Sequence, residues 1–162
     1  LPSNGLHTNG YSLARKLIFD IGGYRVNDKH LRLEKSIGLA LLEPHINYTN
    51  HIFSLLDRGI DIKGIAHITG GGLIENIPRI IPNGCCAEIK KESWPILSIF
   101  HILQSIGNID ENEMFRTFNM GVGMVMVVDS AEISKINDTL QTQTRVYQIG
   151  SITSGIKKIA LV

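Results

Sequence analysis

Apolar residues recur at helical spacing from residue 11 to residue 21, and the pair Gly22-Gly23 follows as a stop signal. This pattern predicts a helix over residues 11–21, with Asn9 placed to cap its first turn. The same spacing predicts further helices over residues 37–43, 48–58, 73–79, 95–106, 110–118 and 130–141. In the helix over 48–58, the residues expected to face the core are Ile52, Phe53, Leu55 and Leu56.

Short apolar runs between these helices predict strands. The runs cover residues 62–69, 85–89, 121–128, 146–149 and 157–162. Helices and strands therefore alternate, without an internal repeat or a low-complexity linker. This order favours one α/β (α+β) domain over residues 1–162, built as a mixed sheet covered by helices.

Residues 150–157 come close to a phosphate-binding P-loop, but Ile156 occupies the position of the required lysine. Too few residues follow for the helix that such a loop requires, so we expect a turn there. The histidines have no spacing typical of zinc ligands, and Cys85 and Cys86 are adjacent rather than two residues apart. We therefore expect no metal site on this chain.

The composition narrows the choice of partners. Hydrophobic residues make up 43% of the 162 residues, charged residues make up 19%, and the net charge is +1. Such a chain buries a real core, and its charge gives no reason to expect nucleic acid or a membrane surface. Adjacent free thiols are typical of a reducing compartment, so we expect the cytoplasm.

The segment from Ser3 to Gly10 is dense in glycine, hydroxyl and amide groups and runs directly into the first predicted helix. Unpaired N–H groups and the helix dipole favour an anion at such a place, so phosphate is the expected ligand. The candidate binding residues of this loop are Ser3, Gly5, His7, Thr8, Asn9 and Gly10. The alternative is an N-capped surface loop that binds nothing.

A second candidate lies where a predicted strand runs into three glycines and then into a helix. Ordering three successive glycines is entropically costly unless a ligand or another backbone approaches closely. The candidate residues are His67, Thr69, Gly70, Gly71, Gly72, Glu75 and Asn76. The alternatives are a simple turn, a hydrogen-bonded core histidine and a helix-surface amide.

A third candidate surrounds the start of the predicted strand over residues 121–128. Gly121 and Gly123 straddle this start, which indicates a bulge or a close contact, and Asn119 is positioned to aim its amide into a cleft. A purely structural kink is the alternative.

Taken together, these segments resemble one family. The segments that carry the resemblance are Gly5–Leu13 with Arg15-Lys16, Leu42–Pro44, Gly64–Leu73 with Glu75–Arg79, Ser93–Pro95 and Met114–Met124. In this order and at these intervals they are similar to phosphoribosylformylglycinamidine cyclo-ligase. Asn4 and Thr8 stand where that family commonly has serine, and the stretch after Pro44 departs from the family pattern.

The resemblance implies a two-domain enzyme of which this chain is the second, substrate-contacting domain, with a three-layer and partly ferredoxin-like fold. The chain begins at Leu1 directly with a motif-rich loop, which is typical of a fragment. The implied reaction is ATP-dependent ring closure of formylglycinamidine ribonucleotide to aminoimidazole ribonucleotide, ADP and phosphate in purine biosynthesis. ATP and Mg²⁺ are then expected mainly on the missing N-terminal domain, the full enzyme is expected to be a homodimer, and this half alone is expected to be inactive.

Carried over residue by residue, the resemblance implies His7 and His67 as catalytic residues. The implied substrate- or phosphate-binding residues are Ser3, Gly5, Thr8, Asn9, Gly10, Thr69, Gly70, Gly71, Gly72, Glu75, Asn76, Asn119 and Gly121. Two other functions remain open. They are a non-catalytic module that binds a phosphate ligand, and another ATP-using member of the superfamily such as formylglycinamidine ribonucleotide synthetase.

Overall fold

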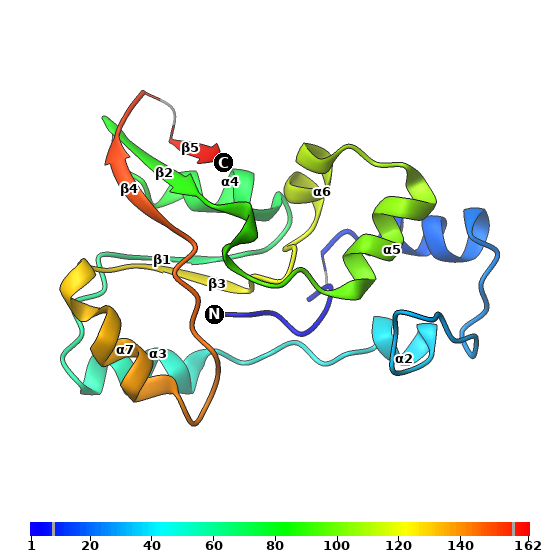
Figure 1. Cartoon of the computed structure of the whole chain (residues 1–162), viewed down its shortest axis with the longest axis horizontal. Coiled ribbons are helices and arrows are strands. Elements are labelled where there is room, and N and C mark those ends of the chain that lie inside the picture. The colour runs from blue at the N-terminus through cyan, green and yellow to red at the C-terminus, as the bar shows by residue number, and fades with distance from the viewer. Residues whose placement is uncertain (8, 157) are drawn as a thin grey trace.

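The structure is a computed structural model that describes residues 1–7, 9–156 and 158–162. Figure 1 shows the strands in the left part of the molecule, with α3 and α7 below them and α2, α5 and α6 to their right. The helical segments are α1 (Tyr11–Arg15), η1 (Lys16–Ile21), α2 (Ile37–Leu41), α3 (Thr49–Asp57), α4 (Gly72–Asn76), η2 (Ile77–Arg79), η3 (Lys91–Ser93), α5 (Ser98–Gly107), α6 (Glu111–Thr117), η4 (Ser130–Glu132) and α7 (Ile133–Leu140). The strands are β1 (Gly64–His67), β2 (Cys85–Ile89), β3 (Met124–Val127), β4 (Gly150–Ser154) and β5 (Ile159–Leu161).

The strands form two sheets. β1 pairs with β3 in antiparallel register, with Ala66 opposite Val125. β2 lies between β4, which is antiparallel to it, and β5, which is parallel to it. The α/β class and the mixed sheet that the sequence predicts are therefore confirmed, although the strands are divided between two sheets.

The N-terminal segment extends the β1–β3 sheet. The Ser3 amide donates to the Gly121 carbonyl at 2.9 Å, and the Gly123 amide donates to the Leu1 carbonyl at 3.0 Å. Pro2 and Val122 form an isolated antiparallel bridge between these two interactions. The opening loop thus begins at a fixed place next to β3.

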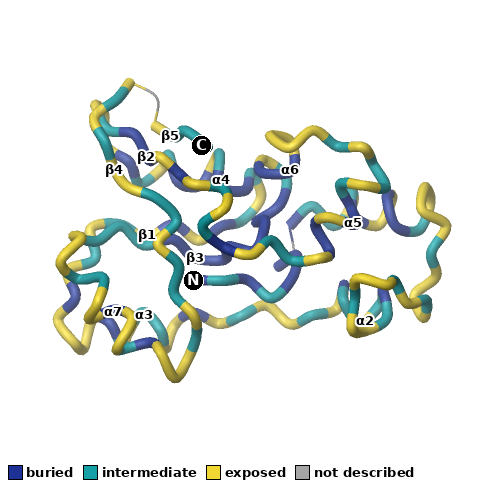
Figure 2. Tube along the Cα trace, viewed as in Figure 1, coloured by how far each residue is buried: buried dark blue, intermediate teal, exposed yellow. Residues whose placement is uncertain are grey.

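The main core gathers where α5 and α6 meet the opening helix. Phe100, Phe115 and Phe118 are completely buried, and the Trp94 ring meets the Phe115 ring edge-on. A second cluster lies under α3 and α7, around Leu55 and Leu140. Figure 2 shows buried positions along the start of β3 and on parts of α5 and α6. Burial of this apolar surface is the main force that stabilises the fold.

Of the two closing strands that the sequence predicts, the second corresponds to β5 (Ile159–Leu161) and the first is wrong. Residues 146–149 are not a strand, and the expected turn after them is largely β4, in which Ser151 lies opposite Glu88 of β2. No apolar alternation marks β4, because both of its faces are partly exposed, so the pattern gave no strand signal. Lys157 lies outside the described residues.

Two inward-facing assignments in α3 are also wrong. Phe53 is 58% exposed and Leu56 is 47% exposed, whereas Leu55 is fully buried. α3 is covered on one side only, where it packs against α7, so its apolar stripe is narrower than the sequence suggests.

Gly72 marks the place where α4 packs directly on α6. A methyl group at Gly72 would lie 2.1 Å from the Phe115 carbonyl oxygen, and the residue adopts φ +55°. At Gly70, two positions earlier, a methyl group would meet nothing within 4 Å. Close helix contact therefore requires the third glycine of the run, but not the first.

We expect Gly72→Ala to lower the free energy of unfolding by about 3 kcal/mol or more, because the new methyl group overlaps backbone atoms at a positive φ. Gly70→Ala is the matched control and is expected to change stability by less than about 1 kcal/mol. Urea denaturation of both variants measures the difference. Equal stabilities of the two variants would contradict the packing role of Gly72.

Candidate functional site

The buried amide of Asn119 ties the opening loop to the start of β3. Its Oδ1 accepts from the Ser3 hydroxyl at 2.7 Å and from the Gly121 amide at 2.9 Å. Its Nδ2 donates to the carbonyls of Gly5 at 2.8 Å and Leu6 at 3.1 Å. All these partners lie within the chain, so Asn119, which is completely buried, fixes the loop that carries His7.

Asn9 joins the same loop to the end of β1, because its Nδ2 donates to the Ile68 carbonyl at 3.1 Å. The predicted capping role of Asn9 is wrong, since Gly10 is the N-cap of α1 and no side chain caps this end. Gly10 adopts φ +65°, and a methyl group there would lie 2.4 Å from the Phe118 ring. Thr8 lies outside the described residues.

The buried side chain of Asn76 holds the three-glycine loop (residues 70–72) through hydrogen bonds. Its Nδ2 donates to the carbonyls of Gly70 at 3.2 Å and Gly72 at 2.8 Å, and its Oδ1 accepts from the Thr69 hydroxyl at 3.1 Å. The Glu75 side chain folds over Gly71, which has φ +95°. Asn76 therefore holds the loop in shape, and exposed Gly70 is the part of the loop with open space above it.

A histidine cluster lies between these loops. The buried ring of His7 stacks on His45, with centroids 4.1 Å apart and planes at 28°. His45 in turn meets His67 at the end of β1, with their Nε2 atoms 3.2 Å apart. The Tyr48 ring packs against all three imidazoles, and its hydroxyl donates to the Pro2 carbonyl at 2.6 Å.

The Tyr48 ring fits closely against the start of β3 because Gly123, directly before the strand, has no side chain. A methyl group at Gly123 would lie 1.9 Å from the Tyr48 hydroxyl oxygen. Gly123 is therefore needed for the close approach of the Tyr48 ring, which agrees with the close contact that the glycine pair indicates.

Burial and the charges of neighbouring histidines favour the neutral forms of His7 and His67. Desolvation, and then the nearby charges of His45 and His67, lower the pKa of His7 to about 4. Desolvation and the charge of His45 also lower the pKa of His67. Burial raises the pKa of Tyr48. At neutral pH, His7 and His67 are hydrogen-bonding groups and proton acceptors rather than cations.

The three predicted loops thus meet at one place, and the structure adds two residues to them. His45 and Tyr48 were not among the predicted site residues, and they line a cavity of about 310 Å³ together with His67. His45 belongs to no candidate motif, and the departure from the family pattern after Pro44 is the one signal in the sequence at this position.

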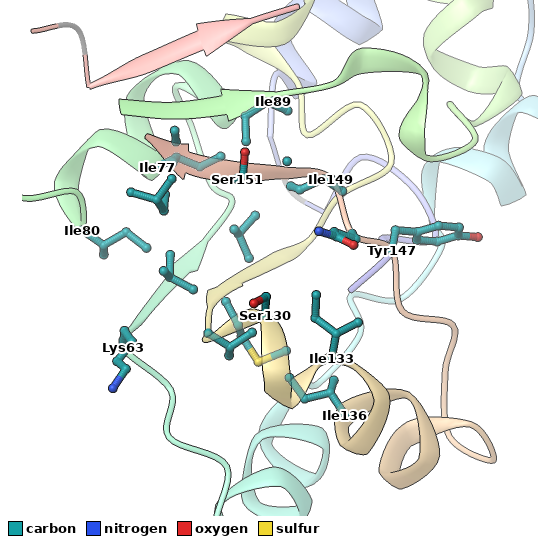
Figure 3. A pocket seen from close by; sticks show the side chains of 18 of the residues that line it. Lys63, Ile77, Ile80, Ile89, Ser130, Ile133, Ile136, Tyr147, Ile149 and Ser151 are labelled. Carbon is teal, nitrogen blue, oxygen red and sulfur yellow. The ribbon is translucent and has the colours of Figure 1, made fainter. Parts of the chain in front are cut away.

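A larger cavity of about 600 Å³ lies elsewhere, between the two sheets and α7 (Figure 3). Its walls are mostly aliphatic, with Ile89, Ile133 and Ile149 pointing into it. No predicted site residue lines it, within the part of the chain that the structure describes. Met124 lines both cavities, so the larger one adjoins the cavity of the histidine cluster but contains none of its imidazoles.

Among residues 1–7, 9–156 and 158–162, no group of three histidine, cysteine, aspartate or glutamate side chains is arranged to hold a metal ion. The searched helices are all too short or too polar to cross a membrane.

Residues 1–161 match the family described as AIR synthase related protein, C-terminal domain. Phosphoribosylformylglycinamidine cyclo-ligase of Citrifermentans bemidjiense is 54% identical over 136 residues, which are 84% of this chain and 39% of that protein. The protein of the same name from Syntrophus aciditrophicus is 48% identical over 153 residues, covering 94% of this chain and 44% of that protein. The chain therefore spans less than half the length of these curated relatives.

Solved structures with the same fold include thiamine-monophosphate kinase from Stenotrophomonas maltophilia, with a TM-score of 0.63 at 15% identity, over 99% of this chain and 48% of that one. A hydrogenase maturation protein of E. coli aligns with a TM-score of 0.61 at 19% identity, over 99% of this chain and 45% of that one. At such identities the likeness shows a shared fold.

We expect Asn119→Ala to lower the free energy of unfolding by about 3 kcal/mol or more, because it leaves buried partners unsatisfied on two loops. Ser3→Ala removes one of these hydrogen bonds and is expected to cost about 1 kcal/mol. Urea denaturation measures both changes. A loss for Asn119→Ala no larger than that for Ser3→Ala would show that the amide does not hold the loops together.

The lowered pKa of His7 predicts a loss of stability in acid. Unfolded His7 binds a proton near pH 6.5 and folded His7 only near pH 4, so the unfolded state binds more protons between these values. The contribution of neutral His7 to the free energy of unfolding is complete above pH 6.5, and about 3 kcal/mol of it is lost as the pH falls to 4. His7→Gln is expected to flatten this part of the pH dependence of unfolding, whereas an unchanged slope would contradict the assignment.

Proposed function

This chain belongs to the family of AIR synthase related C-terminal domains, and we propose that it is the substrate-contacting half of a phosphoribosylformylglycinamidine cyclo-ligase. The proposed reaction is ATP-dependent closure of formylglycinamidine ribonucleotide to aminoimidazole ribonucleotide, ADP and phosphate. The relatives at 54% and 48% identity carry the name of this enzyme.

The observation that best supports this function is the meeting of the opening loop, the three-glycine loop and the Asn119 loop around a histidine cluster. The cluster places His67 at the end of β1, beside exposed Gly70 and within hydrogen-bond distance of His45. A proton-accepting imidazole beside accessible backbone suits a reaction that needs positioning and charge stabilisation.

In the proposed reaction, the formyl amide oxygen is phosphorylated by ATP, the substrate's amidine nitrogen attacks the activated carbon, and phosphate leaves. The attacking nitrogen must lose a proton as the new carbon–nitrogen bond forms. We assign proton acceptance or substrate orientation to His67, because its imidazole is exposed and its lowered pKa keeps it neutral.

His7 has a different place in this proposal. Its ring is 3% exposed and covered by His45, and its Nε2 lies 2.5 Å from the Asn4 side-chain oxygen. A buried ring in this position supports the cluster by packing against His45. We therefore propose that His7 orders the site and that His67 contacts the substrate.

Asn119 and Asn76 are proposed to act on the substrate through the loops that they hold, because their amide groups already bind those loops. Exposed Gly70 is the proposed contact to phosphate in the three-glycine loop. We propose that ATP and Mg²⁺ are held mainly by a preceding domain, that the whole enzyme is a cytoplasmic homodimer, and that these partners complete the site.

We expect His67→Asn to lower kcat for ring closure by about 100-fold or more in the whole protein that carries this chain, since it removes the proton acceptor. The exposed His101 on α5 provides the control, and His101→Asn is expected to leave kcat unchanged. A steady-state assay with formylglycinamidine ribonucleotide and ATP measures both. Equal kcat values for the two variants would reject the assigned role of His67, and absence of ring closure by the wild type would reject the function.

A further inference from the structure

His45 occupies the centre of the histidine cluster, between a buried imidazole and an exposed one. It stacks on His7 at 4.1 Å and meets His67 edge-on, at 80° between ring planes and 5.1 Å between centroids. Neither the motifs nor the family likeness gives it a role, since it stands in the stretch that departs from the family pattern.

The hydrogen bonds of His45 determine where its proton lies. Its Nδ1 is 2.8 Å from the Ile46 carbonyl oxygen. A carbonyl oxygen only accepts, so Nδ1 must carry the hydrogen. In the neutral ring, Nε2 of His45 is then the lone-pair atom.

This lone pair faces His67, because the two Nε2 atoms are 3.2 Å apart. A hydrogen bond at this distance needs one donor and one acceptor. Since Nε2 of His45 accepts, Nε2 of His67 must carry its hydrogen. The remaining ring nitrogen of His67, Nδ1, is left as the atom that accepts a proton.

We propose that His45 is a positioning residue that fixes the tautomer and ring orientation of His67, so that Nδ1 of His67 is the proton-accepting atom of the site. The consequence for catalysis rests on the proposed function, but the tautomer itself does not. His45 acts through His67 and does not itself contact the substrate.

The surroundings hold His45 in place for this role. Its ring lies on His7, and the Tyr48 ring meets it edge-on at 80°. Tyr48 is fixed in turn by its hydrogen bond to the Pro2 carbonyl. His45 is an exposed residue, but contacts with the rings of His7 and Tyr48 therefore hold its imidazole in place.

The arrangement also limits the pair to one extra proton. If both rings were charged, two N–H groups would face each other across 3.2 Å, which is repulsive. Among the described residues, the rings that pack against the pair are the neutral ring of His7 and the hydroxyl-bearing ring of Tyr48, and neither offers a compensating negative charge at neutral pH.

The decisive test is ¹⁵N NMR of the histidine rings at neutral pH, in the protein that carries this chain. We expect wild-type His45 to be protonated on Nδ1 and wild-type His67 on Nε2, each as a single tautomer. His45→Phe keeps the ring but removes the acceptor, so His67 is expected to shift toward the tautomer mixture of free imidazole. His45→Gln offers an acceptor oxygen near the same place and is expected to restore the wild-type state.

A His67 ring signature that is the same in wild type and His45→Phe overturns the proposal, and so does a wild-type His45 protonated on Nε2. A change that His45→Gln does not reverse also overturns it, because the hydrogen bond would then not be the cause. Since these readouts need no turnover, they stand even if the protein fails to close the imidazole ring.

The kinetic arm connects the tautomer to the proposed reaction. We expect His45→Phe to lower kcat by about 10-fold with little change in KM, and His45→Gln to recover most of the loss. In a His67→Asn background, His45→Phe is expected to have no further effect on kcat, because its target is gone. Independent, multiplicative losses in the double variant would overturn the positioning role.

Discussion

The carboxamide of Asn119 is the constraint on which the arrangement of the site depends. It is completely buried and uses both its oxygen and its nitrogen to join segments more than a hundred positions apart in the sequence. No apolar residue could replace it, because the carbonyls of Gly5 and Leu6 would lose the hydrogen bonds from its amide, although Leu6 keeps one from the Asn9 backbone. A buried polar group thus specifies the path of a loop that hydrophobic packing alone would leave free.

The histidine cluster follows from this path. His7 adopts φ +52°, an uncommon conformation for a residue with a side chain, and the loop around it holds the ring under His45. Because His7 is neutral, His45 stacks on a polar but uncharged ring. His67 then has His45 as its defined hydrogen-bond partner. The chemistry of one exposed imidazole is therefore set by layers of hydrogen bonds and ring contacts beneath it.

Much of the fold could be predicted from the sequence. The helix over residues 11–21 and the strand over residues 85–89 have strong apolar patterns, and the structure has α1 with η1 and β2 there. β4 could not be predicted, because Gly150–Ser154 has no apolar face and its pairing with β2 is a tertiary contact. The three candidate loops could be predicted one by one from their motifs. Their meeting in one region, the hydrogen bonds of Asn76 and Asn119 within the chain, and the place of His45 depend on contacts that no local pattern encodes.

The approach of Tyr48 to Gly123 has an evolutionary consequence. Because the tyrosine hydroxyl occupies the space of a side chain at position 123, the two positions cannot change independently. The phenol at 48 must be lost before alanine is acquired at 123, because the opposite order passes through this clash. Substitutions at this pair are thus ordered in time, and glycine at 123 must persist for as long as tyrosine occupies position 48.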